Sequence, residues 1–167
     1  MDFVIEPVST EDGKAIIDIF NHYVKNSFAA YPESKVPYEF FDLFLEMAEG
    51  YPFLVAKDSA QDGKEEVLGF SLLRPHNPIL AFSGVAEVTC FLAPEHTGKG
   101  IGKKMLDRLL VGAREKGIKS ILASISSLNS ASLAFHKKNG FQECGRFVGI
   151  GRKWGQDFDV VWMQRMV

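Results

Sequence analysis

The segment HTGKGIG (96–102) places Gly98, Gly100 and Gly102 at alternate positions between an apolar run and an amphipathic stretch. Glycine lets backbone N–H groups approach an anion with no Cβ in the way, and the first turn of a helix offers unpaired N–H groups with a partial positive charge. Lys99 and Lys103 add positive charge at the same place. The segment therefore favours a phosphate-binding loop over a plain tight turn that starts a helix.

Two common phosphate-binding motifs do not match this loop. A P-loop requires glycine at the position of Thr97 and Ser or Thr at the position of Lys104. The dinucleotide-binding fingerprint requires its last glycine where Lys103 stands, and it normally opens a βαβ unit near the start of a domain. A second glycine-rich segment, GIGRKWG (149–155), leads into an expected strand, and we interpret it as a loop.

Glu87 is a carboxylate within an otherwise apolar strand, VAEVTCFL (85–92). A carboxylate in such a place needs a partner or a chemical role, because burial of an unpaired charge is costly. A general base that takes a proton from a substrate is one such role. A solvated or ion-paired side chain near the start of the strand explains the residue equally well, and the sequence leaves both interpretations open.

The segment NSASLAFHKKNG (129–140) is predicted to form a short helix that Asn139-Gly140 ends. His136 is the residue here that could exchange a proton near neutral pH, although an isolated helical histidine is more often structural. Asn129 either binds a ligand or caps the helix that begins at Ser130.

The composition of the chain predicts one globular domain over residues 1–167. The chain has 46% hydrophobic residues and a net charge of −2. A nearly neutral chain gives no global attraction for nucleic acid or an anionic membrane, so we predict neither partner. The first residues do not resemble a secretory signal, and the longest apolar runs are too short to cross a bilayer, so we expect a cytoplasmic protein.

The cysteines and histidines indicate neither a disulfide framework nor a metal site. Cys90 and Cys144 both fall in expected strands, where we interpret them as small buried hydrophobic residues. The spacing of the histidines does not suit a metal, so we predict none; these are His22, His76, His96 and His136. We expect His22 to make a structural contact and place His76 and His96 in loops.

Periodicity and turn residues predict the order βααβββαβαββ, which is an α/β or α+β class with a mixed sheet. Ser9 and Thr10 offer an N-cap for the first helix, and Gly117 offers a C-cap for the helix after the glycine loop. Asp62-Gly63 predicts a hairpin turn. The expected strands are 2–8, 52–58, 66–74, 85–93, 120–126, 141–148 and 157–167, and the expected helices are 11–27, 38–50, 101–116 and 129–140.

The motifs together resemble the GNAT superfamily of N-acetyltransferases. TGKGIG (97–102) is similar to the family's acyl-CoA pyrophosphate loop, Q/R-x-x-G-x-G/A, with Thr97 in place of Gln or Arg. N-x-x-S at Asn129 and Ser132, and H-x-x-x-G-F from His136 to Phe141, resemble the phosphinothricin N-acetyltransferase-like branch. The resemblance covers nearly the whole chain and implies a central, mostly antiparallel sheet flanked by helices.

The resemblance also implies roles for individual residues. Acetyl-CoA would lie along strand 85–93, where backbone groups of Phe91 and Leu92 would pair with the pantetheine arm. Glu87 would be the general base and His136 the general acid or a contact of the sulfur, in a direct transfer within a ternary complex. The remaining cofactor-binding residues would be Thr97, Gly98, Lys99, Gly100, Ile101, Gly102, Lys103, Asn129 and Ser132.

The same resemblance places the acceptor pocket between FAAYPESKVP (28–37) and RPHNPILAF (74–82). Phe28, Tyr31 and Phe82 would supply an apolar wall. An amino-acid acceptor needs a cation for its carboxylate, and Ile79 stands where the branch often has arginine; Arg74 or Arg152 could substitute. The predicted acceptor is a primary amine of a small molecule, and amino acids or analogues such as phosphinothricin or methionine sulfoximine are the candidates.

Two other functions are compatible with the sequence. A protein N-terminal or lysine acetyltransferase would need an open peptide groove, and a non-catalytic acyl-CoA-binding module would bind the thioester without turnover. Members of the branch are often homodimers, and we expect strand 157–167 and the loop with Trp154 to contribute to such an interface.

Overall fold

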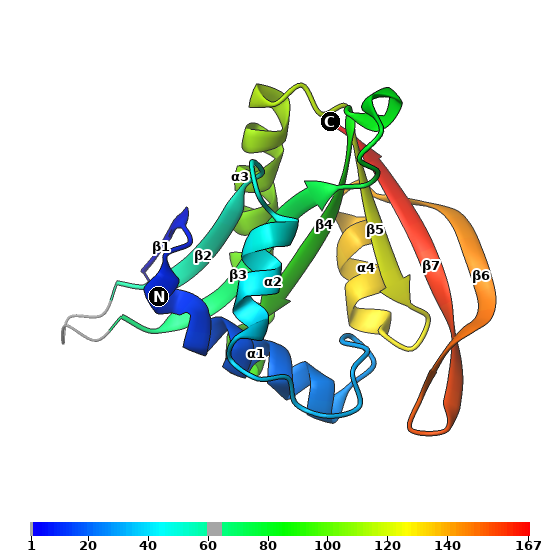
Figure 1. Ribbon diagram of the computed structural model, residues 1–167, viewed down its shortest axis with the longest axis horizontal. Helices are drawn as coiled ribbons and strands as arrows, with labels where there is room; N and C mark the ends of the chain where they lie inside the picture. Colours follow the sequence, from blue (N-terminus) through cyan, green and yellow to red (C-terminus); the bar gives the residue numbers. More distant parts are fainter. Residues whose placement is uncertain (1, 60–64) are drawn as a thin grey trace.

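A single seven-stranded sheet forms the centre of the computed structural model, which describes residues 2–59 and 65–167 (Figure 1). The strand order is β1-β2-β3-β4-β5-β7-β6, and every neighbouring pair is antiparallel except β4 and β5. The strands are β1 (Phe3–Pro7), β2 (Phe53–Asp58), β3 (Val67–Pro75), β4 (Val85–Leu92), β5 (Ser120–Ser126), β6 (Gln142–Lys153) and β7 (Gln156–Met166). This mixed sheet and its element order confirm the predicted fold class.

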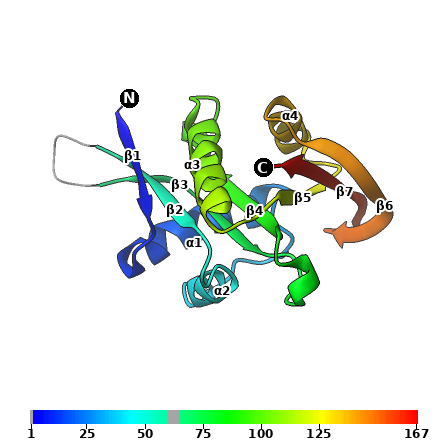
Figure 2. The ribbon, with the colours of Figure 1, turned by 90° about the horizontal axis from the view of Figure 1, so that it is seen from above.

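The helices cover the two faces of the sheet in pairs (Figure 2). On one face α1 (Gly13–Asn26) and α2 (Phe40–Met47) pack onto an aromatic cluster that includes Phe20, Phe44, Phe70 and Phe91. On the other face lie α3 (Ile101–Glu115) and α4 (Ser130–Lys138), against aliphatic residues such as Ile121. Side chains of a strand alternate between faces, so each residue of β4 is assigned to one of these two layers.

Local signals set several helix boundaries, as the sequence predicts. Ser9 and Asp12 form a capping box on the 3-10 turn Thr10–Asp12 that leads into α1, with the Ser9 amide donating to Asp12 Oδ2 at 2.8 Å. Gly117 follows α3 with φ = 72°, a left-handed conformation that suits glycine at a helix C-terminus. Among the described residues, no helix has both the length and the apolar character needed to span a membrane.

The C-terminal hairpin corrects two predictions. Residues 149–153 are not loop but the end of β6, and Trp154 and Gly155 alone make the turn. Cys144, expected to be buried, is exposed because β6 is the outer strand of the sheet, whereas β7 is paired on both sides. The predicted Asp62-Gly63 turn lies outside the described residues.

Strands β4 and β5 separate part-way along their length. They pair only through Val85–Glu87 and Ser120–Leu122, and beyond this point each keeps its other neighbour but loses the pairing between them. The sheet therefore opens into a gap between the second half of β4 and the second half of β5. Such a gap exposes main-chain groups in the middle of a sheet, where they would otherwise be paired.

Candidate active site

The glycine loop presents backbone amides at the start of α3. Gly98 and Gly100 have φ = 73° and 82°, and no described heavy atom lies within 4 Å of where a Cβ would stand on either residue. The amides of residues 98–103 have no hydrogen-bond acceptor among the described residues. Free amides at the positive end of a fifteen-residue helix fit a phosphate group.

The side chains of this loop are less available to a ligand than its backbone amides. Thr97 Oγ1 donates to the carbonyl of Pro94 at 2.9 Å, and the Lys103 ammonium pairs with Asp107 at 2.6 Å. Ile101 is buried beneath α3. Gly102 has a different role from the other two glycines, because a Cβ on it would lie 3.3 Å from the ring of Phe135. It therefore permits close packing of α3 on α4.

The main chain of β4 faces the gap at Cys90 and Leu92. Hydrogen bonds from His76 N to Val85 O and from Ala93 N to Leu68 O show that odd-numbered residues of this strand bond to β3. Even-numbered residues consequently turn toward β5. The backbone groups of Phe91 therefore face β3, not the gap as predicted. The backbone groups at the gap are those of Cys90 and Leu92. The Leu92 carbonyl accepts from Tyr23 Oη at 2.6 Å.

Glu87 lies on the α1–α2 face at the point where the two strands separate, and its side chain is 14% exposed. Its Oε1 is 3.4 Å from Nη2 of Arg74, the residue opposite it on β3, and its Oε2 is 3.5 Å from Nδ1 of His76. The Arg74 Nε is buried and has no hydrogen-bond partner among the described residues. This arrangement places a carboxylate, an arginine with an unused donor and an imidazole together.

Residues 16–141 match the model of the Acetyltransferase (GNAT) family. The chain belongs to this family. The match spans the whole glycine loop, Glu87 and α4.

Three similar proteins extend this result. An L-methionine sulfoximine/L-methionine sulfone acetyltransferase of Pseudomonas aeruginosa is 32% identical over 98% of this chain and 94% of its own. A phosphinothricin acetyltransferase of Sinorhizobium meliloti, solved in complex with acetyl-CoA, is 28% identical with a TM-score of 0.90, over 100% of this chain and 89% of its own. A ribosomal-protein-alanine N-acetyltransferase of Brucella melitensis is 31% identical with a TM-score of 0.87, over 98% of this chain and 99% of its own.

These findings confirm the predicted GNAT fold, the resemblance to the phosphinothricin acetyltransferase branch and the assignment as an acetyl-CoA-dependent N-acetyltransferase. The free amides of the glycine loop and the backbone amides of Cys90 and Leu92, which β5 does not pair, fit the diphosphate and the amide-containing arm of acetyl-CoA.

The α4 residues predicted to bind the cofactor or transfer a proton bond mainly to one another. Asn129 Oδ1 accepts from the Ser132 amide at 3.2 Å, so it caps the helix. His136 is buried between the rings of Phe135 and Phe141, and its Nδ1 lies 2.8 Å from the Ser132 carbonyl. A carbonyl can only accept, so Nδ1 carries the proton.

This geometry does not favour His136 as a general acid. A neutral ring that donates from Nδ1 has a lone pair on Nε2 and no second proton to give. Burial lowers the pKa of His136, although the bond to Ser132 opposes this effect. The imidazolium is therefore disfavoured at neutral pH, and the residue suits a structural role within α4.

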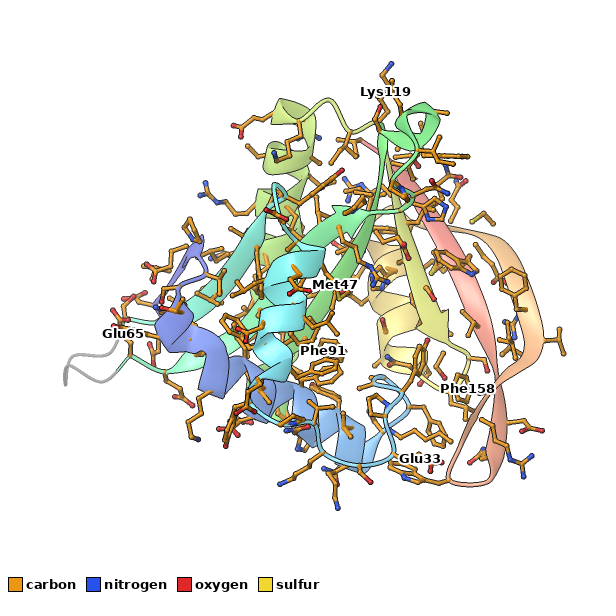
Figure 3. The ribbon with its side chains drawn as sticks, viewed as in Figure 1. Glu33, Met47, Glu65, Phe91, Lys119 and Phe158 are labelled. Atoms are coloured by element: carbon orange, nitrogen blue, oxygen red, sulfur yellow. The ribbon has the colours of Figure 1, made fainter. Side chains whose placement is uncertain are left out.

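Residues expected around the acceptor are brought together on the α1–α2 face. Phe28 and Tyr31, in the loop between α1 and α2, contact the ring of Phe158 on β7, with centroid distances of 5.8 and 5.5 Å. Figure 3 labels Phe158 on β7. Burial raises the pKa of Tyr31, whose hydroxyl lies beside Ser124 of β5. The ring of Phe82 packs against the imidazole of His76, with a distance of 6.3 Å between the ring centroids.

Arg152 does not join this group. Its guanidinium pairs with Asp157 at 3.1 Å near the turn of the β6–β7 hairpin, where both side chains are exposed. Ile79 is exposed as well. Of the two arginines considered for an acceptor carboxylate, only Arg74 is close to Glu87.

Sequence reasoning missed His76, which it placed in a loop without a role. The signal that could have found it is the two-residue period of a strand: His76 follows Arg74 by two positions and therefore shares its face. The pairing of Arg74 with Glu87 in the sheet then brings His76 next to the same carboxylate. The register that pairs Arg74 with Glu87 cannot be read from the sequence alone.

Two other features lie away from this site. A hollow of about 480 Å³ between α2, β2 and α3 is lined by none of the predicted site residues. Ligand atoms of Glu66, Glu95 and His96 lie within 4.8 Å of one another, but both carboxylates are exposed and His96 is buried. The prediction that the enzyme needs no metal stays untested.

Proposed function

We propose that this enzyme transfers the acetyl group of acetyl-CoA to the amino group of a small amino acid or a close analogue. The observation that carries the proposal is the buried, unpartnered Nε of Arg74 beside Glu87. A guanidinium presents Nε and one Nη along a single edge, which matches the two oxygens of a carboxylate. The named substrates of the P. aeruginosa and S. meliloti relatives support an acceptor of this class.

The chain's residues divide the reaction into binding and proton transfer. Amides of residues 98–103 bind the diphosphate, and the amides of Cys90 and Leu92 bind the pantetheine arm and polarise the thioester carbonyl. Glu87 removes a proton from the acceptor ammonium, after which the nitrogen attacks the carbonyl carbon. The new C–N bond forms as the C–S bond breaks, and the sulfur leaves as the thiolate.

His76 provides an exit for the proton that Glu87 accepts. Its side chain contacts Glu87 and is 34% exposed, against 14% for Glu87, so it returns that proton to water. The second proton of the nitrogen, lost as the amide forms, neutralises the thiolate through the same groups or through water. The net reaction releases N-acetylated product, coenzyme A and one proton.

A direct attack suits this site better than an acyl-cysteine intermediate. Cys90 is the cysteine nearest the gap, but burial raises the pKa of its thiol to about 12. A thiol is a nucleophile only as the thiolate, so Cys90 is a poor acyl carrier near neutral pH.

Tyr31 limits access to the acceptor side, although it is 45% exposed. Tyr31 reaches from the α1–α2 loop to Ser124, on the far side of the gap from Glu87. A peptide substrate would need this crossing to move, whereas a single amino acid would not. A small acceptor is therefore favoured over a protein N-terminus, even though the B. melitensis neighbour is named for a ribosomal protein.

We further propose a cytoplasmic homodimer. The edge strand β6 exposes Phe147, Val148 and Ile150 by 54, 81 and 62%, more than an isolated edge normally carries. The two cysteines are free, as is usual in a reducing compartment. Light scattering should give twice the chain mass for the wild type and the chain mass for V148D; a monomeric wild type would contradict the dimer.

The acceptor class is tested with matched amines. Thiol release from acetyl-CoA is measured with methionine sulfoximine, with methionine and with methionine amide, which lacks the carboxylate. We expect R74M to raise the KM for the free acids about tenfold or more and to leave that for the amide nearly unchanged. Equal use of acid and amide by the wild type would refute the carboxylate role, and turnover of peptides alone would favour the protein acetyltransferase.

A further inference from the structure

Lys153, at the end of β6, is fully buried and has no carboxylate partner within salt-bridge distance among the described residues. Its ammonium instead donates to three backbone carbonyls, those of Val24, Ser27 and Ala30, at 2.8, 2.7 and 2.6 Å. The number of donors equals the number of acceptors, so the group is fully satisfied. All three carbonyls belong to the last turn of α1 or to the loop that follows it.

The neighbour of Lys153 makes a second connection to the same loop. The Trp154 amide donates to Glu33 Oε1 at 2.7 Å, and its ring contacts Phe28 at 5.5 Å and the Lys153 ammonium at 4.2 Å. Figure 3 labels Glu33 in the loop and Phe158 on β7, and Figure 1 shows the turn of the hairpin next to the loop. The turn of the β6–β7 hairpin therefore holds the α1–α2 loop in place through these contacts.

The opposite side of that loop faces the site. Leu122 pairs with Glu87, so Ser124, two residues on, lies on the same face of the sheet, and Tyr31 reaches it from the loop. Trp162 pairs with Ser124 and contacts His76 at 6.2 Å. The segment that Lys153 holds therefore lies on the same face of the sheet as Glu87, over β5 and β7.

We propose that Lys153 is a positioning residue for acceptor recognition, which fixes the α1–α2 loop, with Phe28 and Tyr31, over the gap beside Glu87. This inference rests on the acceptor space assigned under the proposed function. Lys153 touches no reacting atom. Its effect reaches the reaction through the position of the loop, and displacement of a binding wall by about 1 Å is enough to weaken catalysis strongly.

The geometry requires an ammonium in particular. Removal of the side chain leaves three carbonyls without donors, and a methionine of similar length fills the space without satisfying them. Arginine is a poor substitute because its planar donors cannot point at three carbonyls arranged around one nitrogen. We therefore expect K153R to behave like K153M rather than to rescue it.

The chain offers a matched control in Lys57. Its side chain is also nearly buried, but its partners are the carboxylates of Glu6, Asp12 and Glu65, at the β1–β2 side of the sheet. K57M and K153M each remove one buried ammonium and both should lower the melting temperature. Only K153M should alter the acceptor loop.

The test compares the two variants by kinetics and by hydrogen exchange. In K153M we expect the KM for the acceptor amine to rise about tenfold or more while the KM for acetyl-CoA changes less than about twofold. Amides of residues 27–36 should lose protection in K153M and keep it in K57M. A folded K153M with unchanged acceptor KM, or with loop protection equal to that of K57M, would overturn the proposal.

Two further arms keep the result interpretable. If K153M does not fold, E33A removes the acceptor of the surface bond from the Trp154 amide, and we expect a rise of about two- to threefold in acceptor KM with the same selective loss of loop protection; no change in either would contradict the inference. If the wild type acetylates no amine, the proposed function fails, but hydrogen exchange still decides whether Lys153 holds the loop.

Discussion

The proposed donor and acceptor halves of this site are built in different ways. The donor half consists of backbone amides from one continuous stretch, residues 98–103, and from a single strand. The acceptor half consists of side chains from β3, β4, β7 and the α1–α2 loop. The β6–β7 hairpin holds this loop in place, although it lies more than a hundred residues away in sequence. Main-chain recognition tolerates changes in side chains, whereas the acceptor half depends on each of them.

This difference predicts that the donor half is common to relatives and that selectivity lies in the acceptor half. Thr97 illustrates the first point. It stands where the family motif has Gln or Arg, and its hydroxyl turns back to Pro94, yet the amides of the loop remain free. Substitutions should therefore separate into those that affect the chemistry or the acceptor and those that affect acetyl-CoA.

The largest effect is expected at Glu87. E87Q keeps the shape of the side chain but removes the base, so turnover should fall about 100-fold or more. The affinity for coenzyme A, measured by titration calorimetry, should stay within about twofold because Glu87 lies on the acceptor side. Equal loss of turnover and of coenzyme A affinity would show that the two halves are not separable.

G100V is the corresponding test of the donor half. Valine disfavours φ = 82°, and its side chain would occupy the open space that we assign to the diphosphate. We expect the dissociation constant of coenzyme A to rise about 50-fold or more by calorimetry. G50V is the control, because Gly50 has φ = 77° and equally open surroundings far from the loop. If G50V weakened coenzyme A binding as much as G100V does, backbone strain alone would explain both results.

A moderate effect is expected at His76. H76Q retains a polar group beside Glu87 but cannot carry a proton, so kcat should fall about three- to tenfold. The KM for acetyl-CoA should not change. Because the lost step is proton release, a high concentration of a small imidazole buffer should restore part of the rate. Full activity of H76Q in dilute buffer would remove His76 from the proton path.

The smallest catalytic effect is expected at His136, where pH matters for stability instead. The folded state lowers the pKa of this group below its usual 6.5, so the unfolded chain binds more protons just below that pH. Stability should therefore fall as the pH drops from 7 through 6.5 toward 5, and H136Q should flatten this fall in thermal unfolding curves. Loss of most turnover in a well-folded H136Q at pH 7 would restore the general acid assigned by resemblance.

The parts that could be predicted from the sequence are those that short segments determine. The capping box at Ser9, the glycines before α3 and the Asn129 cap are each encoded within a few residues. The α4 assignment shows the limit, because the same segment that predicts a helix does not tell whether His136 faces substrate or core.

The remaining parts depend on contacts between distant segments. Glycines at 149 and 151 indicate a loop, but Gly151 is required because a Cβ there would clash with the Phe158 ring across the hairpin. The segment therefore continues as β6, and Lys153 at its end becomes buried. Likewise, the Arg74–Glu87–His76 group depends on the register between β3 and β4. The irregular connection between these strands, residues 76–84, does not indicate that register in the sequence.

The three carbonyls bound by the Lys153 ammonium join the α1–α2 loop to the β6–β7 hairpin, so these two segments form one structural unit. A chimaera that imports residues 28–37 from a relative, to acquire its substrate, would place a foreign segment on a native hairpin and lose activity. Exchange of that segment together with residues 147–158 would carry the junction intact. Substrate choice in this scaffold would then be transplanted as a pair of segments.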